Sequence, residues 1–203
     1  MIIDPQAVSH GSMYHFMNSV VVPRPIAFVS TVGESGRFNV APFSYYNAIA
    51  NQPPLVGISI LQRPDRPKDT LRNIRLTRDF VVNVVDEALH DRSVQASGDW
   101  PQDVDEFGIT GLTPVTSDLV RSPRVGESPV SLECRLHREI ELGNVSLVVG
   151  EIVRAHVRDD VLTDGRVDPA KLKPVGRLSG DGYAYMGRLV SLARPKVEPP
   201  ARP

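Results

Sequence analysis

The pattern of hydrophobic and polar positions along the chain predicts many short strands and few helices. Apolar and β-branched residues run from 26 to 32 and resume at 38–40 after a glycine-containing turn, which predicts a β-hairpin. A further strand is predicted at 55–60, because Pro53 and Pro54 precede it and exclude a helix there. We expect this strand to lie near the first hairpin.

The two longest strands are predicted at 130–142 and 145–157. Apolar and polar residues alternate from Val130 to His137, which is typical of a strand with one buried face. The dipeptide Gly143-Asn144 between the two segments favours a tight turn. We therefore expect these segments to pair as an antiparallel hairpin.

The helical patterns are short and lie scattered between the strands. Apolar residues at helical spacing predict a helix over 68–78, which either Asp69 or Thr70 can cap. A second helix is predicted over 87–96. The remaining elements are strands at 80–85 and 189–192, and a loop over 99–124 with a short turn at 103–107.

This arrangement predicts a mainly β fold, a barrel with a few short covering helices. Strands joined by hairpin turns argue against the regular βαβ alternation of a doubly wound fold. A chain of 203 residues suits a single core. We assign residues 1–193 to one domain and residues 194–203 to a Pro-rich tail without regular structure.

Composition narrows the classes of partner and compartment. The chain has 23 Lys and Arg against 24 Asp and Glu and no block of five like charges, so we expect neither nucleic acid nor a membrane as partner. Its single cysteine, Cys134, excludes an intrachain disulfide framework and fits a reducing compartment. The sequence shows no secretory signal pattern and no apolar run of membrane-spanning length, so we expect a cytoplasmic protein.

The familiar catalytic motifs are absent from the sequence. It contains no nucleophile elbow, zinc-protease helix, P-loop or glycine-rich dinucleotide motif after a strand. The five histidines lack the close spacing of metal ligands, so we expect no metal site. No catalytic side chain is predicted, and the chemistry is expected to come from a bound cofactor.

One charged segment, residues 63–70, directly precedes the predicted helix. It contains Arg63, Arg66 and Lys68, followed by the hydroxyl of Thr70. The free N–H groups of a helix N-terminus attract an anion, and neighbouring cations add to that attraction, so the segment suits a phosphate. The alternative is a solvated loop whose charges contribute only solubility, and the residues alone leave that choice open.

Several spaced motifs occur in a fixed order along the chain. They are Arg24-Pro-Ile-Ala-Phe-Val-Ser-Thr31, Gly36-Arg-Phe-Asn-Val-Ala-Pro-Phe-Ser44, Asn51-Gln-Pro-Pro-Leu55, Lys68-Asp-Thr-Leu-Arg-Asn73, Val149-Gly-Glu-Ile152, and Pro174-Val-Gly-Arg-Leu-Ser-Gly180 followed by Tyr183. Together they resemble the flavin reductase-like family of FMN-binding split-barrel proteins, which includes flavoredoxins. Motifs in fixed order over most of the domain are far more specific than any one of them.

The resemblance implies a homodimer that binds FMN at the edge of a split β-barrel, near the subunit interface. It places the FMN phosphate at residues 63–70 and the isoalloxazine ring beside Asn39 and residues 41–45. The cofactor-binding residues it implies are Ser30, Thr31, Asn39, Pro42, Phe43, Ser44, Tyr45, Arg63, Lys68, Asp69, Thr70 and Arg177.

Alternatives remain for some of these residues. Arg177 is either a cation over the flavin or the member of a structural salt bridge. Phe43, Tyr45 and Tyr46 lie close together, and we expect at most two of them to contact flavin. The chain has Gly143-Asn144-Val145 where monooxygenase-coupled reductases of the family carry Gly-Asp-His, so the histidine near the nicotinamide is missing.

Three functions are compatible with the resemblance. The first is an NAD(P)H-dependent FMN reductase, in which NADH or NADPH donates the electrons. The second is a flavoredoxin-like carrier that takes electrons from a protein partner. The third is a protein that stores or senses flavin without reductase activity.

Overall fold

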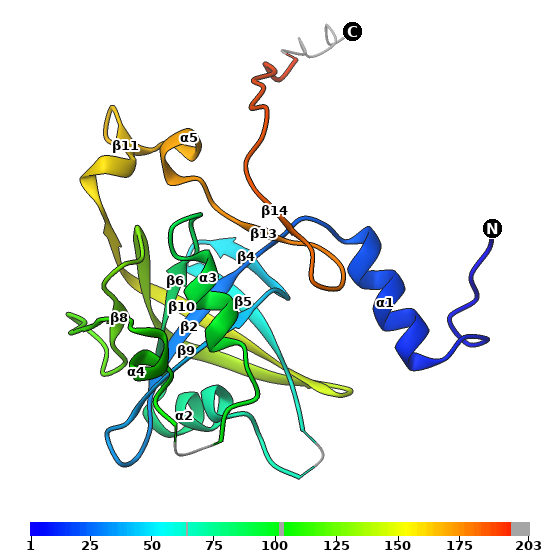
Figure 1. The fold of residues 1–203 in the computed structure, drawn as a ribbon, viewed down its shortest axis with the longest axis horizontal. Coiled ribbons are helices and arrows are strands. Elements are labelled where there is room, and N and C mark those ends of the chain that lie inside the picture. The colour runs from blue at the N-terminus through cyan, green and yellow to red at the C-terminus, as the bar shows by residue number, and fades with distance from the viewer. Residues whose placement is uncertain (64, 102–103, 196–203) are drawn as a thin grey trace, which may run out of the picture.

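The computed structural model describes residues 1–63, 65–101 and 104–195. Its main element is a seven-stranded sheet that curls into a barrel (Figure 1), with strand order β3-β2-β6-β9-β10-β5-β4 and every neighbouring pair antiparallel. The strands are β2 (Ala27–Val32), β3 (Phe38–Phe43), β4 (Tyr46–Asn51), β5 (Pro54–Leu61), β6 (Asp79–Val84), β9 (Val130–Leu142) and β10 (Val145–Val157).

The barrel closes where residues 44–45 join its two edge strands, β3 and β4. The backbone N–H of Ser59, in β5, donates to the carbonyl oxygen of Tyr45 at 2.8 Å. This contact brings β5 next to the end of the first hairpin and confirms the position expected for the strand at 55–60. The residues that follow β3, at 44–45, therefore lie at the rim of the barrel.

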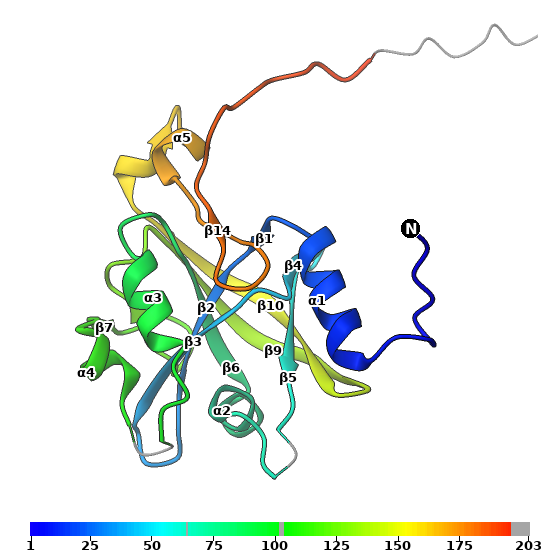
Figure 2. The same cartoon turned by 45° about the vertical axis from the view of Figure 1, so that its right-hand side comes forward.

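Short helices and small sheets surround the barrel. Figure 2 shows α2 below the strands, with α3 and α4 on one side and α1 on the other, next to β4. The helices are α1 (His10–Val20), α2 (Asp69–Thr77), α3 (His90–Ala96), α4 (Glu106–Thr110) and α5 (Pro169–Leu172), with a 3-10 turn at Asp159–Val161. The small sheets are β1 (Arg24–Pro25) with β13 (Gly176–Arg177) and β14 (Tyr183–Ala184), β7 (Pro114–Val115) with β8 (Arg124–Val125), and β11 (Leu162–Thr163) with β12 (Arg166–Val167).

Two hydrophobic clusters form the core. One contains the inward residues of the barrel, such as Val29 and Phe80, and α2 covers it with Leu71 and Ile74. The other contains Phe28 and packs under α3 and α4. Because both faces of β2 are covered, all six of its residues are buried, including Ser30 and Thr31.

The mainly β prediction and both long hairpin strands are confirmed, and β9 and β10 have the predicted bounds. The strands predicted at 55–60 and 80–85 and the helix at 68–78 are confirmed within a residue or two. The half-buried reading of β9 holds only in part, because Ser131 and Glu133 on its polar face are also buried.

Other predictions are wrong or incomplete. Residues 189–192 form no strand. The second helix begins at His90 instead of residue 87, and the turn predicted at 103–107 overlaps helix α4 (Glu106–Thr110) only at its last two residues. Lys68 is the N-cap of α2 and its side chain makes no capping bond, so neither Asp69 nor Thr70 caps the helix.

The pattern also missed α1 and β4. Parts of three predictions lie outside the described residues: Pro64 of the charged segment, residue 103 of the turn, and residues 196–203 of the tail. None of the helices in the described ranges is long and apolar enough to span a membrane.

Candidate cofactor-binding site

A cleft of about 400 Å³ opens where the barrel closes, and we call it the barrel cleft. Residues 42–45 form one wall, and α1, α3 and the segment 177–183 contribute the others. Three cations line it, Arg24, Lys68 and Arg177, and none of its described lining residues is an aspartate or glutamate. In a chain of net charge −1, this concentration of positive charge favours an anionic ligand.

Lys68 occupies the position where the barrel cleft meets the start of α2. Its ammonium nitrogen lies 5.7 Å from the centroid of the Phe43 ring. Burial and, secondarily, the nearby Arg63 lower the pKa of Lys68, while Asp99 raises it. Since the first N–H groups of α2 have no acceptor within the helix, Lys68 and the helix start together suit a phosphate.

Arg177 faces the barrel cleft over an aromatic ring. Its guanidinium carbon lies 4.4 Å from the centroid of Tyr183, and its Nη2 donates to the carbonyl oxygen of Gly180. These contacts hold the side chain without any carboxylate among the described residues. The structural salt bridge considered for Arg177 is therefore not found in this part of the chain, and its charge remains available to a ligand.

Arg24 is a cleft residue that sequence reasoning missed. Only 7% of it is exposed, and it donates to the carbonyl oxygens of Asn18, Val21 and Leu178 at 3.0, 2.9 and 2.9 Å. It also reaches Ser44 Oγ at 3.3 Å. Arg24 thereby ties α1 and the segment after β13 to the end of β3. The signal was present, because Arg24 opens the first family-like motif.

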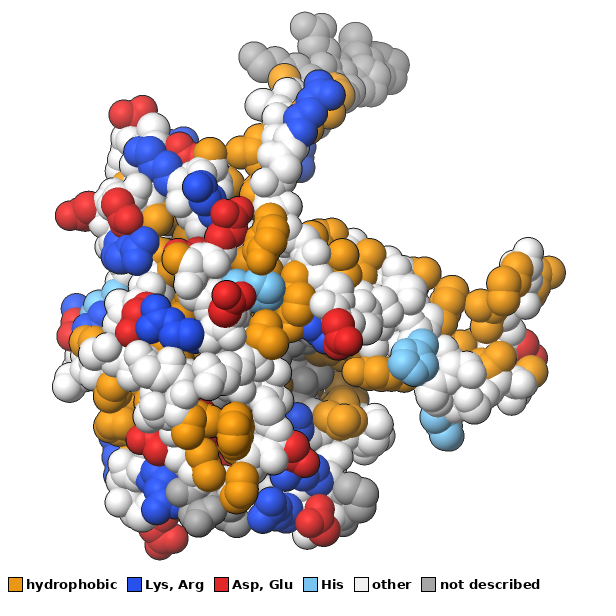
Figure 3. Space-filling model, viewed as in Figure 1, with side chains coloured by type: hydrophobic (Ala, Val, Ile, Leu, Met, Phe, Trp, Pro, Cys, Tyr) orange, Lys and Arg blue, Asp and Glu red, His pale blue; other side chains and the backbone are white. Residues whose placement is uncertain are grey.

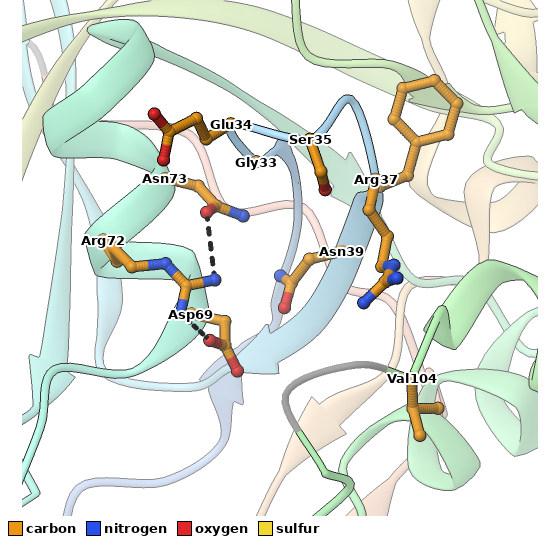
Figure 4. Close-up of a pocket in the computed structure, with 10 residues that line it drawn as sticks. Gly33, Glu34, Ser35, Arg37, Asn39, Asp69, Arg72, Asn73 and Val104 are labelled. Atoms are coloured by element: carbon orange, nitrogen blue, oxygen red, sulfur yellow. Dashed lines mark hydrogen bonds and ion pairs between the residues drawn. The ribbon is translucent and has the colours of Figure 1, made fainter.

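A second pocket, about 780 Å³ in volume, lies between the β2–β3 turn and the start of α2 (Figure 4), and we call it the loop pocket. It is lined by Gly33, Glu34, Ser35, Arg37, Phe38, Asn39, Asp69, Arg72, Asn73 and Val104. The predicted cofactor residues therefore divide between two sites. Pro42, Phe43, Ser44, Tyr45, Lys68 and Arg177 line the barrel cleft, whereas Asn39 and Asp69 line the loop pocket.

Thr31 and Thr70 line neither pocket and belong to a buried polar network. Asn39 Nδ2 donates to Thr31 Oγ1 at 3.4 Å and to Thr70 Oγ1 at 3.1 Å, and Asn73 Nδ2 donates to Thr31 Oγ1 at 3.1 Å. The two threonines therefore position two amides that line the loop pocket.

The two remaining predicted residues, Ser30 and Arg63, also lie outside both pockets. Successive strand residues point to opposite faces, so Ser30 faces away from Thr31. Its hydroxyl donates to the carbonyl oxygen of Pro123 at 2.5 Å and accepts from Asn83. Arg63 forms an ion pair with Asp99. The role of the Ser30 side chain is therefore structural, because its hydroxyl is buried and hydrogen-bonded within the fold.

The fold also brings together three potential metal ligands that sequence spacing did not connect: Asp118, Glu133 and His156. The fully buried Glu133 carboxylate accepts the backbone N–H groups of Asp118 and Leu119, both at 2.7 Å, and His156 Nε2 at 2.6 Å. Both carboxylate oxygens therefore have protein donors. We interpret this cluster as a structural tie between a loop and the sheet.

Comparisons with known proteins identify the family. The flavin reductase-like domain model matches residues 17–171. Nitrilotriacetate monooxygenase component B from Bacillus cereus is 33% identical, with a TM-score of 0.92 over 95% of this chain and 98% of that chain. The 2-nitrobenzoate 2-nitroreductase NbaA from Pseudomonas fluorescens is 32% identical, with a TM-score of 0.89 over 99% and 100% of the two chains. A putative flavin reductase with a split barrel domain from Shewanella frigidimarina is 28% identical, with a TM-score of 0.83 over 96% and 99%.

The family match spans most of the chain, and each of the three solved structures superposes on at least 95% of it. The chain belongs to the flavin reductase-like domain family and has its FMN-binding split-barrel fold.

Proposed function

We propose that this protein binds FMN in the barrel cleft and catalyses hydride transfer from NADH or NADPH to the flavin. The observation that carries the proposal is the barrel cleft itself, whose described lining combines three cations with aromatic rings and no carboxylate. FMN has the complementary chemistry, a planar aromatic ring and a charged phosphate. The family membership of the chain supports the same cofactor.

The residues present fit the two ends of FMN. Phe43, Tyr45 and Tyr183 line the barrel cleft and supply aromatic surface for the isoalloxazine ring. Lys68 and the first N–H groups of α2 would hold the phosphate. The volume of about 400 Å³ lies within the range of small-molecule sites.

FMN, when bound, supplies a ring that accepts hydride from a nicotinamide. The chain's own residues hold the two reactants in contact and exclude water, which removes much of the entropic barrier to the transfer. The guanidinium of Arg177, which lines the barrel cleft over Tyr183, would stabilise the negative charge of a reduced flavin bound there. No side chain is required as an acid or base in this step.

One of the similar structures described above, the nitroreductase NbaA, supports a reductive role. We extend only the reductive chemistry to this chain, with the flavin passing electrons to an acceptor.

A flavoredoxin-like electron carrier is the second candidate. The observation that favours it is Val145, which occupies the position where related monooxygenase-coupled reductases carry a histidine. A carrier would receive electrons from a protein partner and would not need that histidine.

The visible absorbance of the purified protein tests both candidates. We expect at least partly yellow protein that releases FMN on denaturation, and whose flavin absorbance is bleached stoichiometrically by NADH or NADPH under anaerobic conditions without a partner. Flavin that stays oxidised with both nucleotides would favour the carrier. A colourless protein that also fails to bind FMN in equilibrium dialysis would contradict the proposal.

A further inference from the structure

His90 is a buried histidine with no part in the function proposed above. It is the first residue of α3, only 7% of it is exposed, and its Nδ1 lies 2.9 Å from the hydroxyl of Tyr185. Its Nε2 is buried and has no hydrogen-bond partner among the described residues. A neutral ring with its proton on Nδ1 leaves no buried N–H unpaired, so we assign Nδ1 as the donor to the Tyr185 hydroxyl.

The start of α3 holds His90 firmly. The backbone N–H of the preceding residue, Leu89, donates to Asp86 Oδ1 at 2.8 Å, and Ser93 Oγ donates to the carbonyl oxygen of His90 at 2.7 Å. Leu89 and Ala96 pack in the hydrophobic cluster under α3 and α4. Ser93 lines the barrel cleft, so His90 belongs to a rigid element that also forms a wall of the site.

Tyr183 connects His90 to Arg177. The ring centroids of His90 and Tyr183 are 4.2 Å apart, with an angle of 64° between the ring planes. The guanidinium carbon of Arg177 lies 4.4 Å from the centroid of the same tyrosine ring. Tyr183 and Arg177 are also partners in the β13–β14 ladder, and both line the barrel cleft. The three side chains therefore form a continuous row from α3 to the cleft.

The strand that carries Tyr183 has little else to hold it. β14 is an edge strand that pairs with β13 through only two residues, and a pairing so short is marginal by itself. Tyr185 follows β14 directly, and beyond it the chain runs away from the barrel (Figure 1). None of the described residues after Tyr185 forms a hydrogen bond or an ion pair. The bond from His90 is therefore the last one that keeps β14 at the barrel cleft.

We propose that His90 is a positioning residue for the flavin chemistry of the barrel cleft. It holds β14 through Tyr185 and Tyr183, and it thereby fixes the guanidinium of Arg177 at the cleft. This inference rests on the proposed function, in which Arg177 stabilises the negative charge of a reduced flavin. A cation stabilises such a charge best when its position is set beforehand. His90 does not itself line the barrel cleft, so its effect must pass through Arg177.

Two substitutions remove the same hydrogen bond from its two ends. His90→Phe keeps an aromatic ring at the buried position, and Tyr185→Phe removes only a hydroxyl from a side chain that is 56% exposed. Tyr185→Phe therefore still tests the bond if His90→Phe fails to fold. The matched control is His137→Phe, at an exposed position in β9 outside both pockets.

Hydrogen exchange in the full-length protein without flavin tests whether His90 holds β14. Mass spectrometry of a peptide that spans residues 177–185 measures the rate. Both variants should exchange about fivefold faster than wild type, as expected for the loss of one neutral hydrogen bond, and the control should match wild type. An unchanged rate in both variants would overturn the inference.

The midpoint potential of bound flavin tests whether the effect reaches the site, and equilibration with a redox dye measures it without any nicotinamide. Arg177→Met should weaken the binding of reduced flavin relative to oxidised flavin by about tenfold, which lowers a two-electron potential by about 30 mV. His90→Phe and Tyr185→Phe should lower the potential in the same direction. His90→Phe should add nothing once Arg177 is methionine, because the two residues act as a unit.

The remaining outcomes separate the inference from the proposed function. Faster exchange with an unchanged potential would overturn the positioning role and leave His90 as a structural residue. The same conclusion would follow if His90→Phe lowered the potential in full in the Arg177→Met background. A wild-type protein that binds no flavin would instead contradict the proposed function, and the role of His90 in it.

Discussion

Lys68 carries its positive charge in a partly desolvated position. The side chain lies at the N-cap of α2 and over the ring of Phe43, and burial lowers its pKa. A cation in such a place interacts more strongly with a ligand than an exposed lysine does, because less water screens the charge. Its contribution to cofactor binding can therefore be measured separately from the packing of the barrel.

Replacing Lys68 with alanine should weaken FMN binding by about 1.5–3 kcal/mol, the contribution of one charged hydrogen bond. Riboflavin has the same ring without the phosphate, so its affinity should barely change. Equilibrium dialysis with both flavins measures the difference, and Lys171→Ala, outside both pockets, is the control. Equal losses for the two flavins in a folded variant, or no loss for either, would show that the phosphate lies elsewhere.

Glu106 is a buried acid that the flavin site does not use. Only 9% of it is exposed, and its Oε2 has no hydrogen-bond partner among the described residues. Burial, with a smaller contribution from Asp69 and Asp105, raises the pKa of Glu106 to about 7, although backbone N–H groups, including that of Val40, oppose the shift. The folded protein therefore retains a proton that the unfolded chain releases at lower pH.

The free energy of unfolding should consequently fall as pH rises from about 4.5 to about 7, because the unfolded state binds fewer protons in this range. The shift in pKa corresponds to a loss of about 3 kcal/mol once the window has been crossed. Urea unfolding at about pH 5 and about pH 8 should show this loss in wild-type protein and little of it in Glu106→Gln. The exposed substitution Glu87→Gln should retain the wild-type dependence. A Glu106→Gln variant with an unchanged pH dependence would contradict the assignment.

The sequence pattern predicted best those elements that bury one face against other parts of the same chain. The β9–β10 hairpin follows from alternating residues and a turn dipeptide, and both of its strands have the predicted bounds. By contrast, Asn18 is the only buried residue of α1. The apolar residues of α1 therefore do not recur on one face that packs against the barrel core. The apolar run at 189–192 has the composition of a strand and no partner strand in the described chain, which is why that prediction was wrong.

The same distinction applies to the candidate site. The sequence predicted Lys68 as a binding residue from the charged segment and the helix start, and both signals lie within a few residues of Lys68. The contacts of Arg24 with Leu178 and of Arg177 with Tyr183 depend on how distant segments meet, and no sequence period encodes them. The division of the predicted residues between two pockets was likewise visible only in the fold.

The packing of β10 against β6 and β9 requires a glycine at position 150. A Cβ there would collide with the ring of Phe80 and lie 3.2 Å from Cys134 Cβ. Phe80 is fully buried and cannot move freely. Gly150→Ala should therefore reduce the free energy of unfolding by about 1–3 kcal/mol, the usual cost of overpacking.

Urea unfolding measures this loss, and Gly187→Ala is the matched control because a Cβ at 187 meets nothing within 4 Å. The control should remain within about 0.5 kcal/mol of wild type. Wild-type stability in Gly150→Ala would mean that β10 lies less close to Phe80 than described.

At the scale of the whole molecule, the surface is apolar where the chain extends away from the barrel. Tyr14, Met17 and Val20 of α1 are 57%, 44% and 57% exposed, and Val190 and Leu192 near the C-terminus are 68% and 90% exposed. Figure 3 shows hydrophobic side chains on the arm that contains α1 and at the start of the C-terminal segment. Monomeric proteins rarely expose extended apolar surface of this kind.

We therefore expect a homodimer in which α1 and the C-terminal segment pack against a second copy of the chain. A stable interface buries about 1,600 Å² in total, and two projecting apolar segments can supply much of it. Sedimentation equilibrium at micromolar concentration should show twice the 22.3 kDa mass of the chain.

Met17→Asp should shift the equilibrium toward monomer, because it would bury an unpaired charge, whereas Leu119→Asp, in an exposed loop, should leave the dimer intact. Since Tyr14 and His15 of α1 also line the barrel cleft, the Met17→Asp variant should lose FMN affinity together with its partner. A single 22.3 kDa species for wild-type protein would contradict the dimer, and a monomeric variant with unchanged FMN affinity would show that one chain completes the cleft.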